Sequence, residues 1–273
     1  MIAGDEASFL ALTRKVSRDA GLALDAYKDK CLRRRIAVRM RACGVHTYSD
    51  YLSLLDREPG EYEKLKDALT INVTRFYRNP ETWDRLRKDV VPRLIALRQG
   101  RITAWSAGCS SGEEAYTLAM LCVEAAEAAG HRNWADRIRI DATDIDRDCL
   151  ARAAAARYPA QAFSEAPPEL TERYCERDAD HWVVSERVRR LVTVRRVDLL
   201  LEPPPGSGYD LVLCRNVVIY FDRPTQERLF ALFAEALAGG GFLVLGKVET
   251  LLGPGRDRLT LYDARERIFR RPE

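Results

Sequence analysis

Two acidic side chains directly follow a glycine turn near the middle of the chain, an arrangement that could bind a positively charged ligand. The apolar run ITAWSA ends at Ala107 and Gly108, and Glu113 and Glu114 follow the turn GCSSG. Glycine lets the backbone approach a ligand closely, and the N–H groups of a helix that starts there can donate to it. The sequence lacks both the dinucleotide fingerprint G-x-G-x-x-G and the Lys-Ser/Thr pair of a phosphate-binding loop. A carboxylate at this position would repel a phosphate and attract a cation.

Polar residues also follow two other apolar runs. Asp144 ends the run IRIDATD, and Arg215 and Asn216 follow the run YDLVLC. Because open α/β sheets bind ligands at the carboxyl ends of their strands, we expect these residues to share a pocket with Glu113 or Glu114. Asp144 could accept both hydroxyls of a ribose, since Asp146 is better placed to cap the following helix.

Together these residues predict a site for an adenosine that carries positive charge and no polyphosphate. S-adenosylmethionine has this chemistry, because its amino acid tail bears an ammonium and a sulfonium. We therefore predict a methyltransferase that uses S-adenosylmethionine and releases S-adenosylhomocysteine. Either Glu113 or Glu114 could face the cofactor, and the other would then belong to the first helical turn, where acids favour the helix dipole.

The residues before about position 100 predict helices and no strand. Apolar residues recur at helical spacing in FLALTRKVSRDAG, where a glycine ends the pattern, and again in AYKDKCLRRRIAVRMRACG. Two more helical patterns follow, in TYSDYLSLLDRE and GEYEKLKDALTINVTRF. We place a small all-α domain at residues 1–76.

The remaining residues, 77–273, predict an α/β domain. Short β-branched runs alternate with helical runs there, which favours a mostly parallel sheet covered on both faces. The predicted strands are RITAWSA, IRIDATD, LVTVRRV, YDLVLC, GFLVLGK and RIFRR. The segment at about 158–196 is charged and holds short extended pieces, so we expect an insertion with strands of its own.

Composition limits the class of protein. The chain has 273 residues, 47% of them hydrophobic, and a net charge of +3, which is too small to imply nucleic acid binding. No apolar run approaches the ~20 residues that span a bilayer, and the N-terminus does not resemble a secretory signal. We therefore expect a cytoplasmic protein without direct membrane insertion. Seven cysteines without a C-x-x-C pair and three scattered histidines predict no metal site. We expect a monomer, because no large apolar surface stripe is evident.

The second helical pattern is strongly basic. Seven basic residues and one acid lie between Lys28 and Arg41, while Leu32, Ile36 and Met40 form the stripe expected to face the core. This helix is either an ordinary solvated surface or a docking face for an acidic partner. No aromatic residues that could stack on bases are interleaved, which disfavours nucleic acid. The candidate docking residues are Lys28, Arg34, Arg35, Arg39 and Arg41.

Four stretches resemble the CheR family of chemotaxis receptor methyltransferases. They are LTINVTRFYRNPETW, WSAGCSSGEEAYTLAM, ATDIDRDCLARA and LVLCRNVVIYFDRPTQERLF, and the resemblance extends from about Phe9 to Arg270. It implies an all-α N-terminal domain and a seven-stranded, mostly parallel class I methyltransferase sheet of Rossmann-like type. It also implies a small antiparallel β-subdomain at about 158–196. The implied reaction is methyl esterification of glutamate side chains on the cytoplasmic helical bundle of methyl-accepting chemoreceptors.

The resemblance also assigns site residues. The N-x-T-x-x-x-R element, here Asn72, Thr74 and Arg78, reaches the cofactor site in the family, and Tyr220 is the tyrosine of its NVxxYF motif. We expect Arg78 and Tyr220 to be catalytic, although an interdomain salt bridge and ordinary core packing are the alternatives. The basic helix would face the receptor. The residues expected at the cofactor are Asn72, Thr74, Arg78, Ala107, Gly108, Glu113, Glu114, Asp144, Asp198, Leu199, Arg215 and Asn216.

This chain departs from the family pattern in several places. Asp198 and Leu199 stand where many relatives have Asn-Leu, which changes the hydrogen bonds available to an adenine edge. Lys247 stands where many relatives have the histidine of a GHSE-like turn, and Tyr77 replaces a phenylalanine. Relatives that grip a receptor's C-terminal pentapeptide carry a glycine-containing loop in the β-subdomain. The corresponding stretch here, YCERDADHWVV, has no glycine, so we expect independence from such a tether.

Two other functions remain open at this point. One is a methyltransferase of the same fold that acts on another protein, RNA or a small acid. The second is a regulatory module that binds S-adenosylmethionine without turnover.

Overall fold

The structure is a computed structural model that describes residues 2–70, 72–131 and 134–273. The chain forms two compact units. The first comprises Met1–Asn72 and Tyr220–Thr225, and the second comprises Val73–Ile219 and Gln226–Glu273. Within the described part of the chain, no helix has the length and apolar character that a membrane crossing needs.

The first unit confirms the four predicted helices. Its helices are α1 (Ile2–Ala20), α2 (Asp29–Ala42), α3 (Tyr48–Arg57) and α4 (Pro59–Leu69), with a short 3-10 turn at Leu24–Ala26. The prediction of continued helix as far as Phe76 is wrong, because α4 ends at Leu69 and Thr70 is already extended. The β-branched residues Thr70, Val73 and Thr74 favour this extended form.

The segment Tyr220–Thr225 completes the first unit although it lies far along the chain. Tyr27 and Phe221 form an isolated antiparallel bridge, and their rings pack edge to face with centroids 5.0 Å apart. The N–H of Asp222 donates to the carbonyl of Ala26 at 2.9 Å. These contacts attach the residues after the predicted CRN motif to the helical unit.

The second unit confirms the predicted sheet. Seven strands have the order β6-β2-β1-β7-β8-β10-β9, in which β6, β2, β1, β7 and β8 are parallel and β10 runs antiparallel to β8 and β9. The strands are β1 (Ile102–Ala107), β2 (Ile138–Asp144), β6 (Val192–Arg196), β7 (Tyr209–Cys214), β8 (Leu237–Leu245), β9 (Thr260–Asp263) and β10 (Ile268–Arg270). The sequence prediction missed β9, a short edge strand with few apolar residues. All six residues of β7 are buried, as expected of a parallel strand covered on both faces.

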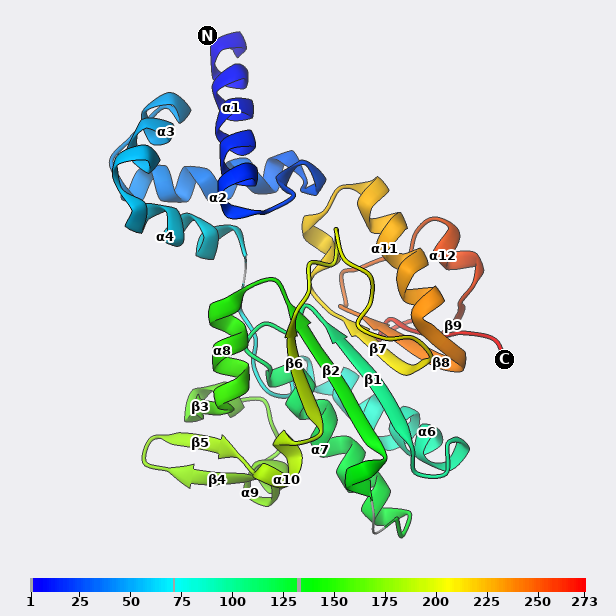
Figure 1. Ribbon diagram of the computed structural model, residues 1–273. Coiled ribbons are helices and arrows are strands. Elements are labelled where there is room, and N and C mark those ends of the chain that lie inside the picture. The colour runs from blue at the N-terminus through cyan, green and yellow to red at the C-terminus, as the bar shows by residue number, and fades with distance from the viewer. Residues whose placement is uncertain (1, 71, 132–133) are drawn as a thin grey trace. The chain divides into compact units, whose positions relative to one another are not determined.

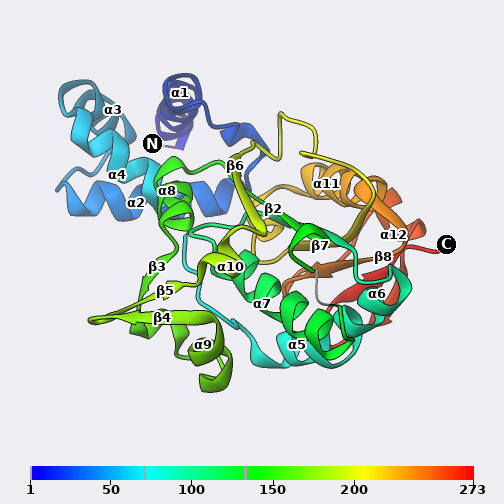
Figure 2. The ribbon, with the colours of Figure 1, turned by 60° about the horizontal axis from the view of Figure 1, so that its bottom comes forward.

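Helices cover both faces of this sheet, with α7 on one face and α11 on the other (Figures 1 and 2). The helices of the second unit are α5 (Pro80–Arg85), α6 (Val91–Leu97), α7 (Glu113–Ala128), α8 (Arg147–Ala155), α9 (Pro168–Tyr174), α10 (Glu186–Arg189), α11 (Arg223–Ala236) and α12 (Pro254–Asp257), with Leu86–Val90 forming a π-helical turn between α5 and α6. Short 3-10 turns occur at Trp134–Asp136, Ala160–Phe163 and Val218–Tyr220.

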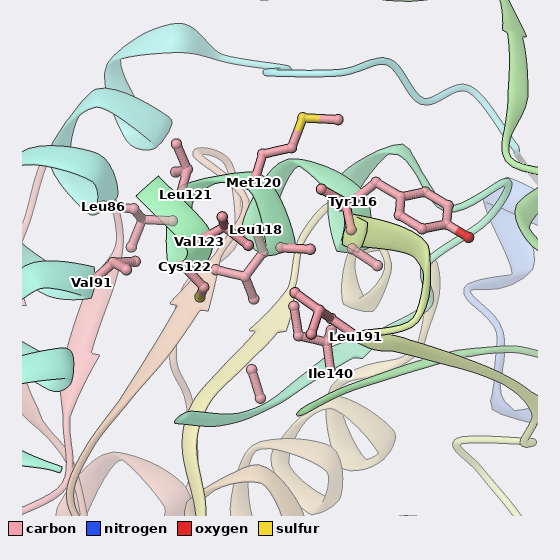
Figure 3. Close-up of a cluster of buried hydrophobic side chains, with 14 of the residues drawn as sticks. Leu86, Val91, Tyr116, Leu118, Met120, Leu121, Cys122, Val123, Ile140 and Leu191 are labelled. Carbon is pink, nitrogen blue, oxygen red and sulfur yellow. The ribbon is translucent and has the colours of Figure 1, made fainter. Parts of the chain in front are cut away.

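The core is built around α7, which is apolar on nearly all sides. Figure 3 shows side chains from α7 between Leu86 and Val91 on one side and Ile140 and Leu191 on the other. The side chains of Leu118 and Cys122 are fully enclosed. Burial of this helix fixes its first residues, Glu113 and Glu114, beside the carboxyl end of β1.

The predicted insertion is a separate three-stranded antiparallel sheet. Its strands, in the order β3-β5-β4, are β3 (Arg157–Pro159), β4 (Cys175–Asp178) and β5 (His181–Val184). Only Ala179 and Asp180 join β4 to β5, and Ala179 adopts a φ of 51°. The hairpin therefore turns tightly without a glycine.

Candidate active site

The turn after β1 brings three strand ends together. Gly108 has a φ of 79°, and a Cβ atom there would lie 2.5 Å from Cγ2 of Val217, so this position requires glycine. The N–H groups of Gly108 and Cys109 both donate to the carbonyl of Thr143, at 2.8 and 2.9 Å. The predicted residues at the ends of β1, β2 and β7 therefore gather at one edge of the sheet, with Ala107 buried beneath them.

The two glutamates at the start of α7 have different environments. Glu113 is 5% exposed, and its Oε2 accepts a hydrogen bond from Oγ of Ser111 at 2.8 Å. None of the ion pairs among the described residues involves Glu113. Burial raises the pKa of the Glu113 carboxyl above its ordinary value. Among the described residues, Glu113 is thus a buried acid without an ion-pair partner, and the Arg152 guanidinium, beyond ion-pair distance, only partly opposes the rise in its pKa.

Glu114 instead belongs to an internal polar network. Its Oε1 accepts from Oγ of Ser106 at 2.9 Å, and its Oε2 lies 3.5 Å from Nη1 of Arg215. Burial raises the pKa of Glu114, although the Arg215 guanidinium opposes this shift. The negative charge of Glu114 is therefore partly balanced by Arg215.

Arg215 connects the end of β7 to the segment that precedes α5. Its Nη2 donates to the carbonyl of Arg78 at 2.7 Å and to Oδ1 of Asn79 at 3.1 Å. Burial lowers the pKa of Arg215, while Glu114 favours its charged form. The Nη1 of Arg78 donates to the carbonyl of Val73 at 2.9 Å. This hydrogen bond joins the two ends of the segment 73–78. Arg78 and the partly exposed Thr74 thus lie in one ordered turn beside Arg215.

Asp144 lies at the tip of β2, as predicted. Its Oδ2 accepts from the N–H of Ser110 at 2.8 Å, and its Oδ1 accepts from the N–H of Asp146 at 3.0 Å. The backbone N–H of Ile145 also favours the ionised form of this carboxylate. Because a carboxylate offers about four lone-pair sites, a ribose hydroxyl could still donate to this partly exposed group. Burial raises the pKa of Asp144. Capping of α8, the alternative role considered for Asp144, is performed by Asp146, which accepts from the N–H groups of Asp148 and Cys149.

Asp198 lies next to Asp144, because the N–H of Val197 donates to the carbonyl of Asp144 at 3.1 Å. Oδ1 of Asp198 accepts from the N–H of Leu200 at 2.8 Å. In the described part of the chain, its Oδ2 is buried and has no hydrogen-bond partner. A buried acceptor without a partner costs free energy, and a donor group on a bound ligand would remove this cost. Leu199 is half-buried beside it.

Asn216 is held by a residue that the sequence analysis did not select. Oε2 of Glu249, which is 2% exposed, accepts from the N–H groups of Asn216 at 3.0 Å and Gly246 at 2.5 Å. Its Oε1 accepts from the N–H of Val217 at 2.9 Å. Asn216 adopts a φ of 61°, and its Oδ1 is another buried atom that lacks a partner among the described residues. The sequence signal for Glu249 was the acid of the turn Gly246–Glu249, which stands where many relatives have a GHSE-like turn.

Asn72 and Tyr220 belong to the first compact unit. Nδ2 of Asn72 lies 3.5 Å from Oγ1 of Thr70. The carbonyl of Tyr220 accepts from the N–H of Lys28 at 2.9 Å, and the guanidinium of Arg35 lies over the Tyr220 ring, 4.2 Å from its centroid. Burial lowers the pKa of Arg35.

The structure divides the five candidate docking residues. Arg35 is 6% exposed and faces inward, so its assignment to an exposed docking face is corrected here. Arg39 is engaged by Glu61, whose carboxylate accepts from Nε at 2.9 Å and from Nη2 at 2.6 Å. Lys28, Arg34 and Arg41 are exposed, as the docking proposal requires.

Comparison with known proteins extends these observations to almost the whole chain. The family model for "CheR methyltransferase, SAM binding domain" matches residues 72–267, and that for "CheR methyltransferase, all-alpha domain" matches residues 7–70.

Individual relatives agree with these matches. A "Chemotaxis protein methyltransferase" of Listeria monocytogenes is 34% identical over 93% of this chain and 94% of its own length. A "Probable chemotaxis protein methyltransferase" of Rhizobium etli is 32% identical over 87% of this chain and 90% of its own length. A "Chemotaxis protein methyltransferase" of Klebsiella aerogenes is 32% identical over 92% and 86%, respectively.

Proposed function

Since the chain belongs to the CheR family and is therefore an S-adenosylmethionine-dependent methyltransferase of chemotaxis, we propose that it methylates glutamate side chains on the cytoplasmic helices of chemoreceptors. The observations that carry the cofactor assignment are the buried Glu113 carboxylate, which has no ion-pair partner among the described residues, and the acceptors that remain open on Asp144 and Asp198. A cationic adenosyl ligand supplies the charge and the donors that these groups lack.

The residues fit S-adenosylmethionine group by group. Glu113 would meet the positive amino acid end, because Glu114 is already engaged by Arg215 and Ser106. Asp144 would accept from a ribose hydroxyl. The free Oδ2 of Asp198 would accept from the amino group of the adenine. The close backbone approach at Gly108 fits the same ligand.

Methyl transfer to a carboxylate needs no strong base. When bound, S-adenosylmethionine supplies an electrophilic methyl group, and a glutamate side chain is already ionised at neutral pH. The protein has to align the reacting atoms and remove water from a weak nucleophile. No cluster of metal-ligating side chains occurs among the described residues.

The catalytic roles proposed for Arg78 and Tyr220 rest on the family motifs. Arg78 would orient the substrate carboxylate, or hold the cofactor side of the site, by a charge-assisted contact. Tyr220 would donate a hydrogen bond near the reacting oxygen, with its ring fixed by Arg35. Normal turnover in both Arg78→Ala and Tyr220→Phe would remove these two residues from the mechanism.

We further propose that this enzyme does not use a receptor C-terminal pentapeptide as a tether. The two-residue turn between β4 and β5 supports this, because it leaves no glycine-containing loop to form a peptide site. Binding of a receptor C-terminal peptide at micromolar affinity would contradict this part of the proposal.

Labelled cofactor distinguishes the substrate classes. The protein is incubated with labelled S-adenosylmethionine and, in parallel, with receptor cytoplasmic fragments, unrelated acidic proteins, total RNA and small carboxylic acids. The proposal predicts label on the receptor fragments alone. Label on another protein, RNA or a small acid would support a methyltransferase of the same fold with a different substrate. Cofactor binding without any transfer would support a regulatory module.

A further inference from the structure

The segment Val73–Asn79 is an ordered turn in a conformation that its own sequence disfavours. Tyr77 and Asn79 have φ values of 59° and 63°, in the left-handed region, which asparagine tolerates and a bulky residue such as tyrosine rarely adopts. Such a segment persists only where its surroundings determine it. The contacts that hold this turn therefore help to determine where Arg78 lies.

The start of the inserted subdomain supplies several of these contacts. The ring of Phe76 stacks on Phe163 with centroids 4.0 Å apart and an angle of 11°, and the N–H of Phe76 donates to the carbonyl of Ala162 at 2.9 Å. Glu165 adds two polar contacts. Its Oε2 accepts from the N–H of Asn79 at 2.9 Å, and its Oε1 accepts from Nη1 of Arg75 at 2.9 Å.

Glu165 and Arg215 hold neighbouring groups of the same turn from two different parts of the fold. Arg215 donates to the carbonyl of Arg78 and to the side chain of Asn79, while Glu165 accepts from the N–H of Asn79. Arg215 is in turn 3.5 Å from Glu114. A continuous polar chain thus runs from the subdomain through Asn79 to the start of α7.

We propose that Glu165 is a positioning residue, which holds the Val73–Asn79 turn in the form that binds the cofactor. The bond from the Asn79 N–H is the effective one, because its acceptor is a carboxylate and its donor belongs to the backbone of the turn itself. The ion pair with Arg75 contributes little, since both side chains are partly exposed. The inserted subdomain therefore shapes the cofactor site in addition to any contact with a receptor. This inference rests on the proposed assignment of the turn to the cofactor site.

Four variants separate these contacts. Glu165→Ala removes both, whereas Glu165→Gln keeps an oxygen that can accept from Asn79 and loses the charge that pairs with Arg75. Arg75→Ala removes the ion pair alone. Asp178→Ala is the matched control, because it removes a 2.8 Å ion pair with Arg157 elsewhere in the same subdomain.

Two readouts are measured on the full chain. The first is the Kd for S-adenosylhomocysteine by calorimetry, and the second is amide hydrogen exchange of residues 73–79 in the free protein. We expect Glu165→Ala to weaken binding about tenfold, as loss of one hydrogen bond to a charged group would, and to accelerate exchange. Glu165→Gln should bind S-adenosylhomocysteine and exchange its amide hydrogens much as the parent protein does. Arg75→Ala and Asp178→Ala should stay within about twofold of the parent, consistent with the small contribution of exposed ion pairs.

Unchanged exchange and binding in Glu165→Ala would overturn the inference. Equal losses in Glu165→Ala and Asp178→Ala would also overturn it, because they would reflect general loosening of the subdomain. Failure of the unmodified protein to bind S-adenosylhomocysteine would instead contradict the proposed function. The exchange measurement contains no cofactor, so in that case it still decides whether Glu165 orders the Val73–Asn79 turn.

Discussion

Oε2 of Glu114 lies 3.5 Å from Nη1 of Arg215 at the carboxyl ends of the central strands, where Arg215 is buried and Glu114 is largely covered. This pairing distinguishes two adjacent acids that the sequence left equivalent. Arg215 balances part of the charge of Glu114, while Glu113 has no such partner among the described ion pairs. The two glutamates should therefore respond differently to the same substitution.

We expect Glu113→Gln to weaken binding of S-adenosylmethionine at least about tenfold without loss of stability. The affinity falls because a charge-assisted contact with the cofactor disappears. The Tm should stay level or rise at neutral pH. Burial raises the pKa of Glu113, so its ionised form disfavours folding at any pH above that pKa, and glutamine removes this cost. Calorimetric titration and thermal melting provide the two measurements.

Glu114→Gln is the matched comparison. The Glu114 carboxylate is already engaged by Arg215 and Ser106, so we expect a smaller loss of cofactor affinity than in Glu113→Gln, measured by the same calorimetric titration. A loss of cofactor affinity in Glu114→Gln with none in Glu113→Gln would reverse the assignment of the two acids.

Asp198 should control recognition of the adenine amino group. The protein should bind S-adenosylhomocysteine more tightly than its inosine analogue by about tenfold or more, because the analogue presents an oxygen to an acceptor. Asp198→Asn should reduce this preference. Its amide oxygen can keep the bond from the Leu200 N–H, which leaves the NH2 group for the analogue's oxygen. An unchanged preference would show that Asp198 does not contact the base.

Cofactor affinity should decrease on acidification, beginning at a higher pH than the protonation of exposed acids would cause. Burial raises the pKa values of Glu113, Glu114 and Asp144, so they become protonated at a higher pH than exposed acids, which titrate near ~4. A cation binds the ionised form, and protonation therefore opposes binding. The same three groups favour the folded state at low pH, because a raised folded pKa contributes stability that is lost only as the pH rises through it.

Titrations of S-adenosylmethionine between pH 5 and 8 test this dependence. It should be smaller in Glu113→Gln, which has one fewer group to protonate. A Kd that stays constant over this range would contradict the proposed role of the buried acids.

Charge reversal on α2 should affect receptor methylation and leave cofactor affinity unchanged. We expect Arg34→Glu combined with Arg41→Glu to lower methylation several-fold at low ionic strength, since both side chains are exposed. Arg101→Glu, at an exposed position in the second unit, serves as the control. Equal methylation rates in both proteins would argue against α2 as the docking surface.

The sequence predicted the features of this fold that follow from regular patterns. Short β-branched runs between helical patterns marked the parallel strands, and helical spacing marked α1 to α4. It did not mark β9, or the helices α5 and α6 at residues 80–97, where proline and charged residues interrupt the pattern. It also extended α4 beyond Leu69, because a hydrophobic period continues into residues that tertiary contacts hold extended.

For the site, motifs predicted which residues lie together. Their burial and hydrogen-bond partners depend on tertiary contacts that the sequence does not show. Gly108, Asp144 and Asn216 lie at strand ends, as the spacing indicated. The burial of Arg35 could not be predicted from helical phase alone, because it depends on Tyr220, far along the chain. Glu249 was missed because its role consists of accepting backbone N–H groups from a distant loop.

The most direct test of the central claim is methyl transfer to receptor glutamates. Receptor membranes from the same organism are incubated with the protein and methyl-labelled S-adenosylmethionine, and the receptor is then treated with mild base and analysed by mass spectrometry. We predict label on glutamate side chains of the cytoplasmic helices, released by base as methanol. Label that resists base, or a receptor that stays unlabelled while another component is methylated, would contradict the account.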